Sequence, residues 1–201
     1  VMKASYIILF LFFTSSITIW AQAQEKVNPK GKWFFGIEAG KNETISTASN
    51  SFQAGITGEY YFHKNWSFTG RIKYFKTGIS DKDSKLNFSG KVISFPLNIK
   101  LEFKIIGNFS GNLSLGASIN KEIKSYYEYY SQNTFANLST IYQTFNTGVG
   151  FSYFMTKKIG IYFNLEIYTL GNKIHRSTNK VWMYSSIPQN KHHNFGIKFN
   201  L

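Results

Sequence analysis

The sequence contains no cysteine. Disulfides, thiolate metal sites, cysteine nucleophiles and a lipid-anchored cysteine are therefore excluded. Proline is scarce as well, at three residues, and long paired strands tolerate few prolines. Serines and several glutamates are available, but no spacing marks a nucleophile with its base, and no phosphate-binding loop or nucleotide motif occurs. We therefore expect no enzymatic activity, no catalytic residues and no cofactor.

Long apolar runs are confined to the N-terminus. Lys3 precedes the uncharged apolar segment 6–13, and Ala21-Gln22-Ala23 has the small-x-small pattern of a cleavage site. The segment is shorter than the roughly 20 residues that a spanning helix needs. These features predict a cleavable signal peptide over residues 1–23 and a single domain over residues 24–201, although an uncleaved membrane helix is the alternative.

Acidic residues are few, 10 against 23 lysines and arginines, which gives a formal net charge of +13. An exported chain does not meet nucleic acid, so we expect no nucleic-acid partner. Outer-membrane lipids, the phosphates of lipopolysaccharide or an acidic protein are the counterparts that such a charge favours. A basic surface that is simply solvated explains the charge equally well.

Short segments that alternate apolar and polar residues continue to the end of the chain. The clearest is residues 51–62, whose even positions are mostly bulky and apolar. A period of two is typical of a β-strand with one apolar face. The chain also has 20 phenylalanines and 13 tyrosines, an excess that suits a barrel with an apolar outer wall.

Eight strands follow from this alternation. They are expected at 33–40, 51–62, 66–74, 93–103, 109–119, 144–153, 159–168 and 192–201. Short turns near His63, Gly107 and Thr156 alternate with an intermediate connection at 41–50 and long ones at 77–85, 121–138 and 171–190. Short periplasmic turns opposite long external loops are typical of outer-membrane barrels. The sequence therefore predicts an all-β fold, an eight-stranded antiparallel up-and-down transmembrane β-barrel, with a bulge or bend at Pro96.

The residue types on the polar face decide which wall touches lipid. This face is dominated by Gly, Ser, Asn and Thr, which suit a crowded lumen better than a solvated exterior. Trp33, Trp66, Tyr74 and Tyr153 lie near strand ends on the apolar face, where interfacial aromatic girdles occur. A soluble periplasmic lipid-binding barrel would reverse the two walls.

If the polar face is internal, opposite charges share the lumen and must pair, because burying an unpaired charge is costly. The expected lumen charge network consists of Glu38, Glu59, Arg71, Lys73, Lys100, Glu102, Glu166 and Lys198. We expect these residues to plug the barrel; an ion path or gate is the sharper alternative.

Two of the long connections have unusual compositions. One contains Tyr126, Tyr127, Tyr129 and Tyr130, which could stack on sugars or on a protein partner, or could continue a strand pair above the membrane. The other contains Lys173, Arg176 and Lys180, which could contact lipopolysaccharide or be solvated.

The four histidines do not form a metal site in this reading. His63 and His175 lie in connections, and His192 and His193 are adjacent in a strand, so their side chains point to opposite faces. We expect no bound metal.

Several segments together resemble the small outer-membrane barrel proteins of Bacteroidota, the OmpA-like "porin family" barrels. They are the leader ending at Ala21-Gln22-Ala23, the segment 93–100, the segment 148–151 and the C-terminal segment 195–201. The last of these looks like the signal read by the barrel-assembly machinery, although it ends in Leu201 rather than phenylalanine. The resemblance implies an eight-stranded barrel in the outer membrane, with no shared catalytic residues.

The sequence therefore predicts a non-enzymatic outer-membrane barrel with a plugged lumen. Its role would be structural, adhesive or that of an accessory subunit, exerted through external loops that could bind a protein partner. The alternatives are a narrow transporter or porin for a small or hydrophobic solute, and the soluble barrel described above.

Overall fold

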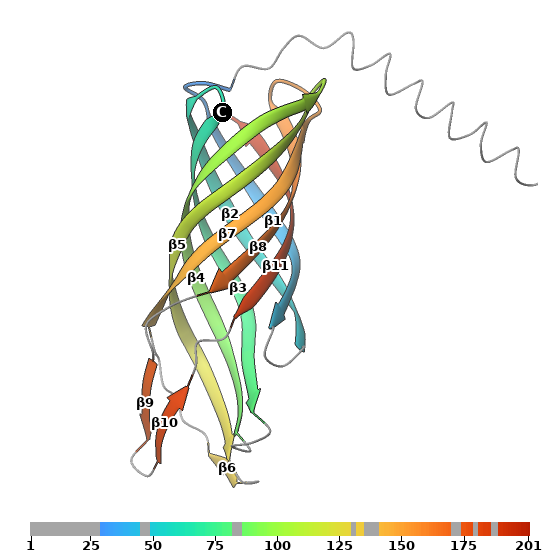
Figure 1. Ribbon diagram of the computed structural model, residues 1–201. Helices are drawn as coiled ribbons and strands as arrows, with labels where there is room; N and C mark the ends of the chain where they lie inside the picture. The colour runs from blue at the N-terminus through green and yellow to red at the C-terminus, as the bar shows by residue number, and fades with distance from the viewer. Residues whose placement is uncertain are drawn as a thin grey trace, which may run out of the picture.

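The fold is an antiparallel β-barrel with tilted strands (Figure 1). The computed structural model describes residues 29–44, 49–81, 86–129, 132–134, 141–169, 174–178, 181–185 and 189–201. The barrel strands are β1 (Trp33–Thr44), β2 (Ser49–His63), β3 (Trp66–Asp81), β4 (Leu86–Ile106), β5 (Phe109–Tyr129), β7 (Ile141–Phe154), β8 (Ile159–Thr169) and β11 (Asn190–Asn200). Within these residues, no helix has the length and apolar character needed to cross a membrane.

Two pairings close the barrel, that of β4 with β5 and that of the first strand, β1, with the last, β11. Strands follow the order β4-β3-β2-β1-β11-β8-β7-β5, and β4 also pairs with β5. The first and last strands pair from Phe34–Asn200 to Thr44–Asn190. The prediction of eight antiparallel barrel strands is confirmed.

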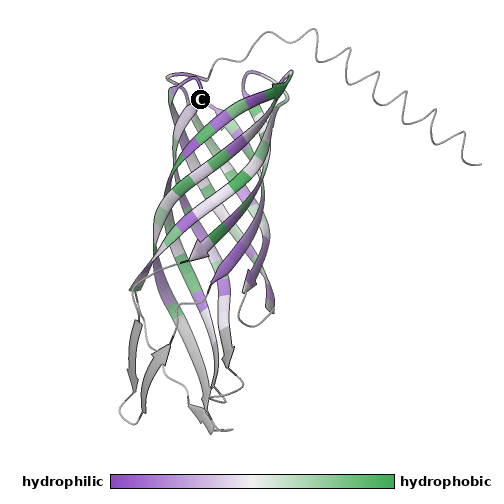
Figure 2. Ribbon diagram, viewed as in Figure 1, coloured by the Kyte–Doolittle hydropathy of each residue, from purple (hydrophilic) through white to green (hydrophobic). Residues whose placement is uncertain are grey.

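Along the strands most apolar side chains face outward and most polar ones inward, apart from a few buried rings such as Phe34. On β1 and β4 the outward residues include Ile37 and Leu97, which are 62% and 72% exposed. The intervening residues, such as Glu38 and Asn98, are buried inside. Figure 2 shows the same alternation as hydrophobic and hydrophilic bands along the strands. The alternative of a soluble barrel with an apolar interior is therefore wrong, because the apolar wall is the outer one.

The two ends of the barrel differ. At the end where both Trp33 and Asn200 lie, β2 and β3 are joined by residues 64–65, β4 and β5 by residues 107–108, and β7 and β8 by residues 155–158. Gly107 has φ of +54°, a conformation that glycine adopts without steric cost. We call this the short-turn end and the opposite one the long-connection end.

At the long-connection end the strands run further than expected. β1 ends at Thr44 rather than at residue 40, and β3 continues to Asp81, through more than half of the predicted loop 77–85. β5 continues to Tyr129, where it pairs with β6 (Gln132–Thr134), and β9 (Ile174–Thr178) pairs with β10 (Val181–Ser185). The sequence did not indicate these strands, because a sheet above a membrane needs no apolar face and its residues therefore lack the apolar–polar alternation.

The predicted bulge at Pro96 is wrong. The β3–β4 register is the same on both sides of it, from Gly70–Leu97 to Lys73–Ser94, but pairing is interrupted opposite Pro96. Bulges in β4 lie instead at Lys91–Val92 and Lys104–Ile106. A proline without an N–H therefore breaks the ladder here without inserting a residue.

Two glycines on opposite walls provide a test of this arrangement. A Cβ on the inward Gly116 would lie 2.1 Å from the Leu97 carbonyl oxygen, whereas one on the outward Gly70 would lie 3.5 Å from Leu97 Cδ2. We predict that Gly116→Val lowers the unfolding free energy by about 3 kcal/mol or more, as overpacking against backbone does, and that Gly70→Val changes it by less than about 1 kcal/mol. Urea unfolding from vesicles measures both, and equal midpoints would contradict the assignment of the two walls.

Candidate functional site

All eight residues of the expected lumen charge network lie inside the barrel. Lys73 is 1% exposed and Glu166 is fully buried, and the other six are at most 7% exposed. The strands place them there because each occupies an inward position of the alternation, on β1, β2, β3, β4, β8 or β11. The structure divides them into two groups of four.

The central quartet contains two cations and two carboxylates. Arg71 forms a hydrogen-bonded ion pair with Glu166, and its Nε lies 3.6 Å from Glu38 Oε2. Lys73 Nζ lies 3.3 Å from both Glu38 Oε1 and Glu166 Oε2. Both cations therefore contact both carboxylates, and the group is neutral when all four are charged.

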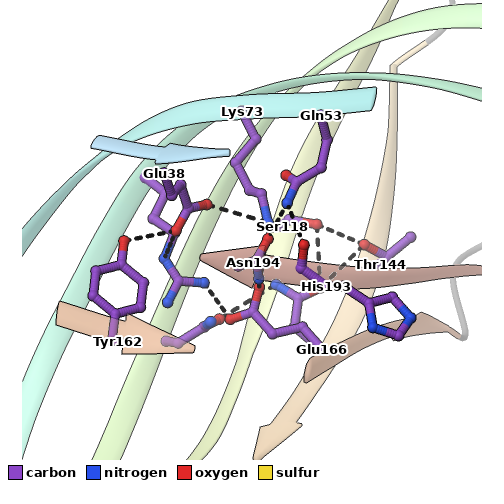
Figure 3. A network of polar contacts seen from close by, with 12 residues as sticks. Glu38, Gln53, Lys73, Ser118, Thr144, Tyr162, Glu166, His193 and Asn194 are labelled. Atoms are coloured by element: carbon purple, nitrogen blue, oxygen red, sulfur yellow. Dashed lines mark hydrogen bonds and ion pairs between the residues drawn. The ribbon is translucent and has the colours of Figure 1, made fainter. Parts of the chain in front are cut away.

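Neutral side chains add hydrogen bonds to the central quartet (Figure 3). Tyr162 donates to Glu38 Oε2 at 2.9 Å. Asn194 donates to Glu166 Oε2 at 2.9 Å and accepts from Lys73 Nζ at 2.8 Å and from Gln53 Nε2. The quartet is therefore fixed from five strands, β1, β2, β3, β8 and β11.

The second quartet lies nearer the short-turn end. Glu59 is paired with Lys100 and, at 2.9 Å, with Lys198. Glu102 Oε2 lies 3.1 Å from Lys100 Nζ and 3.9 Å from Lys198 Nζ. This group is also neutral when charged, so the lumen holds four cations and four carboxylates in two balanced sets.

Aromatic rings adjoin the second quartet at the short-turn end. Tyr61 donates to Glu102 at 2.9 Å and accepts from Lys198 at 2.8 Å. Its ring packs edge-on against Phe34, which packs edge-on against Phe154. The Lys198 ammonium lies 4.8–5.3 Å from the centroids of all three rings, within cation–π range.

Uncharged polar residues fill other parts of the lumen. Against β5 and β7, Ser118 bonds Thr144 at 2.6 Å, and Asn146 donates to Asn98 at 3.3 Å. Toward the long-connection end, Asn190 Oδ1 accepts hydrogen bonds from Asn42 at 3.0 Å, Thr77 at 2.9 Å and Thr44 at 3.5 Å.

Sequence reasoning missed several interior residues. His192 and His193 do face opposite walls, but His192 is buried in the lumen, with its ring 4.6 Å from Phe75 and 4.4 Å from Tyr168. Glu122 is fully buried in a segment expected to be a loop. Every second residue of a strand faces inward. Extending this alternation beyond the apolar stretches of β3 and β5 would have placed Phe75 and Glu122 inside the barrel.

The charges of the two quartets are paired with one another rather than left open as reactive groups. Each carboxylate contacts two cations, and no group of three or more His, Asp or Glu side chains suited to a metal occurs in the part of the chain that the structure describes. Removing one partner from such a buried set is costly, because an uncompensated charge remains.

The other predicted contact residues are remote from this interior. Tyr126, Tyr127 and Tyr129 are among the last residues of β5, toward the long-connection end, and Arg176 belongs to β9. Tyr130, Lys173 and Lys180 lie outside the described residues.

Solved structures similar to this chain are small barrels of bacterial surfaces. Neisserial surface protein A has 13% identity and a TM-score of 0.58, over 84% of this chain and 97% of that one. Ail, the attachment invasion locus protein of Yersinia pestis, solved with the heparin analogue sucrose octasulfate, has 13% identity and a TM-score of 0.52, over 86% and 99%. The outer membrane protein OprG from Pseudomonas aeruginosa has 13% identity and a TM-score of 0.53, over 87% and 99%. At these identities the likeness concerns the fold alone.

No curated protein matches the sequence significantly. The family model described as "Outer membrane protein beta-barrel domain" matches residues 8–199, nearly the whole chain. The chain belongs to the outer-membrane β-barrel family and is a protein of the outer membrane.

Proposed function

We propose that this protein is a sealed, non-enzymatic barrel that holds binding segments at the cell surface. The observation that carries the proposal is the pair of neutral quartets in the lumen. Eight strands leave room only for side chains inside, and here those side chains are tied to one another. Solute passage would require the quartets to separate, so transport is disfavoured.

The long-connection end supports a surface role. β3, β4 and β5 continue well past the ends of β1, β8 and β11, so that a sheet extends beyond the barrel (Figure 1). In outer-membrane barrels the long connections lie outside the cell, opposite short periplasmic turns, and the two ends of this barrel differ in the same way. The extended sheet and the connections beside it are the parts that a partner reaches.

The partner chemistry follows from charge and aromatic content. The chain carries a formal charge of +13, and the similar barrel Ail was solved with a polyanionic heparin analogue. A sulfated or phosphorylated polysaccharide, or an acidic protein, fits the basic residues Lys173, Arg176 and Lys180 and the tyrosines 126, 127, 129 and 130.

Export and assembly complete the proposal. Residues 1–23 would be removed as a signal peptide, as their Bacteroidota-like pattern indicates. Phe195 and Phe199 face outward on the last strand, at 56% and 45% exposure. We propose that this strand is the one read by the barrel-assembly machinery.

Conductance in planar bilayers tests the seal. We predict no steady current for the natural protein. Lys100→Gln with Lys198→Gln leaves Glu59 and Glu102 unpaired, so water and cations enter the short-turn half and small cation-selective currents appear. Glu59→Gln with Glu102→Gln reverses the selectivity, as the reversal potential in a salt gradient shows. A large steady current from the natural protein would refute the seal.

Stability measurements test the balance within the central quartet. Glu166→Gln leaves two cations facing one carboxylate, and we predict a loss of about 3–5 kcal/mol. Combining it with Lys73→Met restores neutrality, so the double variant should be more stable than the sum of the single losses predicts by about 1 kcal/mol or more. The exposed pair Lys41–Glu43 serves as the control, because truncating it should leave the unfolding midpoint unchanged. Additive losses in the quartet would argue against a coupled network.

Whole-cell binding tests the surface role. We predict that replacing tyrosines 126, 127, 129 and 130 with serine, or Lys173, Arg176 and Lys180 with glutamine, lowers binding of cells to immobilised heparin about tenfold while the barrel still folds. The control replaces Lys64, Lys104 and Lys158 at the short-turn end with glutamine. Equal binding by all variants would remove these segments from the proposal.

A further inference from the structure

We propose that the outer wall of β3, β4 and β5 binds a phosphorylated glycolipid of the outer leaflet. Lys76, Lys91 and Lys121 would hold its phosphates, and an apolar groove below them would hold its acyl chains. This inference rests on the proposed function in one respect, the placement of the long-connection end outside the cell.

The three lysines are exposed on the outer wall and lie together across neighbouring strands. Lys76 is directly opposite Lys91, and Lys121 is directly opposite Ile93, the next outward residue after Lys91. Like charges directly opposite each other destabilise a sheet unless something neutralises them. Within the residues that the structure describes, none of the three has a carboxylate partner, so their charge is available to the phosphates of a bound lipid.

The basic residues on the other side of the barrel are arranged differently. Glu43 Oε1 lies 2.6 Å from Lys41 Nζ, and its Oε2 lies 3.7 Å from Lys191 Nζ and 3.5 Å from His193 Nε2. The hydrogen bond from Lys41 lowers the pKa of Glu43 below its ordinary value, so this carboxyl stays charged. The protein supplies its own anion here, whereas none of the described side chains does so for the three lysines on β3–β5.

The lysines lie where headgroups are expected. On each strand the outward residue two positions nearer the short-turn end is apolar or aromatic: Tyr74 below Lys76, Ile93 below Lys91 and Ile119 below Lys121. The outward apolar band of β3 runs from Trp66 to Tyr74, which approaches the roughly 9–11 residues that a tilted strand needs to cross the hydrocarbon. The three lysines therefore lie at the boundary between the hydrocarbon of the outer leaflet and its headgroups.

An apolar groove of about 870 Å³ lies below these lysines; most of its lining residues face outward, and the inward residues Thr57, Arg71 and Ser118 also border it. Its upper wall includes Ile72, Phe95 and Ile119, each on a strand that carries one of the lysines. Gly58 and Gly70, which pair with each other, also line it.

Steric demand does not explain these two glycines. A Cβ on Gly58 or Gly70 would meet its nearest neighbour at 3.7 Å or 3.5 Å, which is ordinary contact. A Cβ would fit at both positions, so the two missing side chains leave space that adds to the hollow.

The shape of the groove favours acyl chains over a second copy of the protein. Its lining crosses six neighbouring strands, from Phe35 on β1 through β2, β3, β4 and β5 to Gln143 on β7. Two cylinders meet along a line and share only a few strands, but flexible hydrocarbon chains follow a curved wall. Several acyl chains beneath a phosphorylated headgroup fit both the length of the groove and the lysines above it.

Lipid retention tests the proposal. The protein is folded into phosphatidylcholine vesicles containing diphosphoryl lipid A as a minor component, and bound lipid A per barrel is counted by native mass spectrometry after mild extraction. We expect Lys76→Gln, Lys91→Gln and Lys121→Gln together to weaken retention on the order of 100-fold, since each lysine contributes about fivefold. Dephosphorylated lipid A should be lost to the same extent from the natural protein.

Two matched controls separate headgroup from groove. Glutamine at Lys64, Lys104 and Lys158 removes the same charge at the short-turn end and should leave retention unchanged. Gly58→Leu with Gly70→Leu fills the groove with the lysines intact and should lower retention several-fold, while heat-modifiable migration confirms folding.

Equal retention by the lysine variant and its control would overturn the proposal, and unchanged retention after filling the groove would overturn its acyl-chain part. Phosphatidylglycerol held as strongly as lipid A would overturn the assignment to a glycolipid. Conductance of the same samples reports the seal separately, so failure of this inference and failure of the proposed function are distinguishable.

Discussion

Charge balance inside a narrow, water-poor cylinder is the constraint on which the rest of the structure depends. A charge moved from water into such an interior loses several kcal/mol of solvation even after relaxation, and only close, hydrogen-bonded counter-charges recover it. The barrel meets this requirement with two sets of two cations and two carboxylates drawn from six strands. Apart from Lys100–Glu102 within β4, every ion pair of the two quartets joins residues on different strands, so the interior also fixes how the strands are arranged.

The two walls consequently have separate tasks. The charged residues of the inner wall pair with one another. Other molecules are therefore contacted by the outer wall and by the extended sheet. Side-chain size on the outer wall is then free to vary. Glycine at positions 58 and 70 fits this view, because neither close packing nor a positive φ demands it there.

Alternation made the fold and most of the interior predictable. A strict period of two assigns every residue of a strand to a wall, so Glu38, Arg71 and Lys198 could be placed inside from the sequence alone. Their division into two quartets could not be predicted, because it depends on how far each strand is displaced around the cylinder, which inter-strand register sets. The strand extensions were missed because apolar residues mark a strand only where lipid contacts it, and Thr77–Asp81 and Lys121–Tyr129 lie beyond that zone. The bulge predicted at Pro96 is absent for a local reason. Proline lacks the backbone N–H donor, which interrupts the β3–β4 pairing at this point without shifting its register.

The seam between β1 and β11 has a consequence for how the molecule forms. Phe34 meets Asn200, residues separated by nearly the whole described chain, and this pairing completes the cylinder. Loop closure over such a distance is entropically unfavourable until the intervening strands are already aligned. Barrel formation is therefore a late, all-or-none event that waits for the final strand, and a chain lacking that strand would keep two open edges ready to pair with a neighbour.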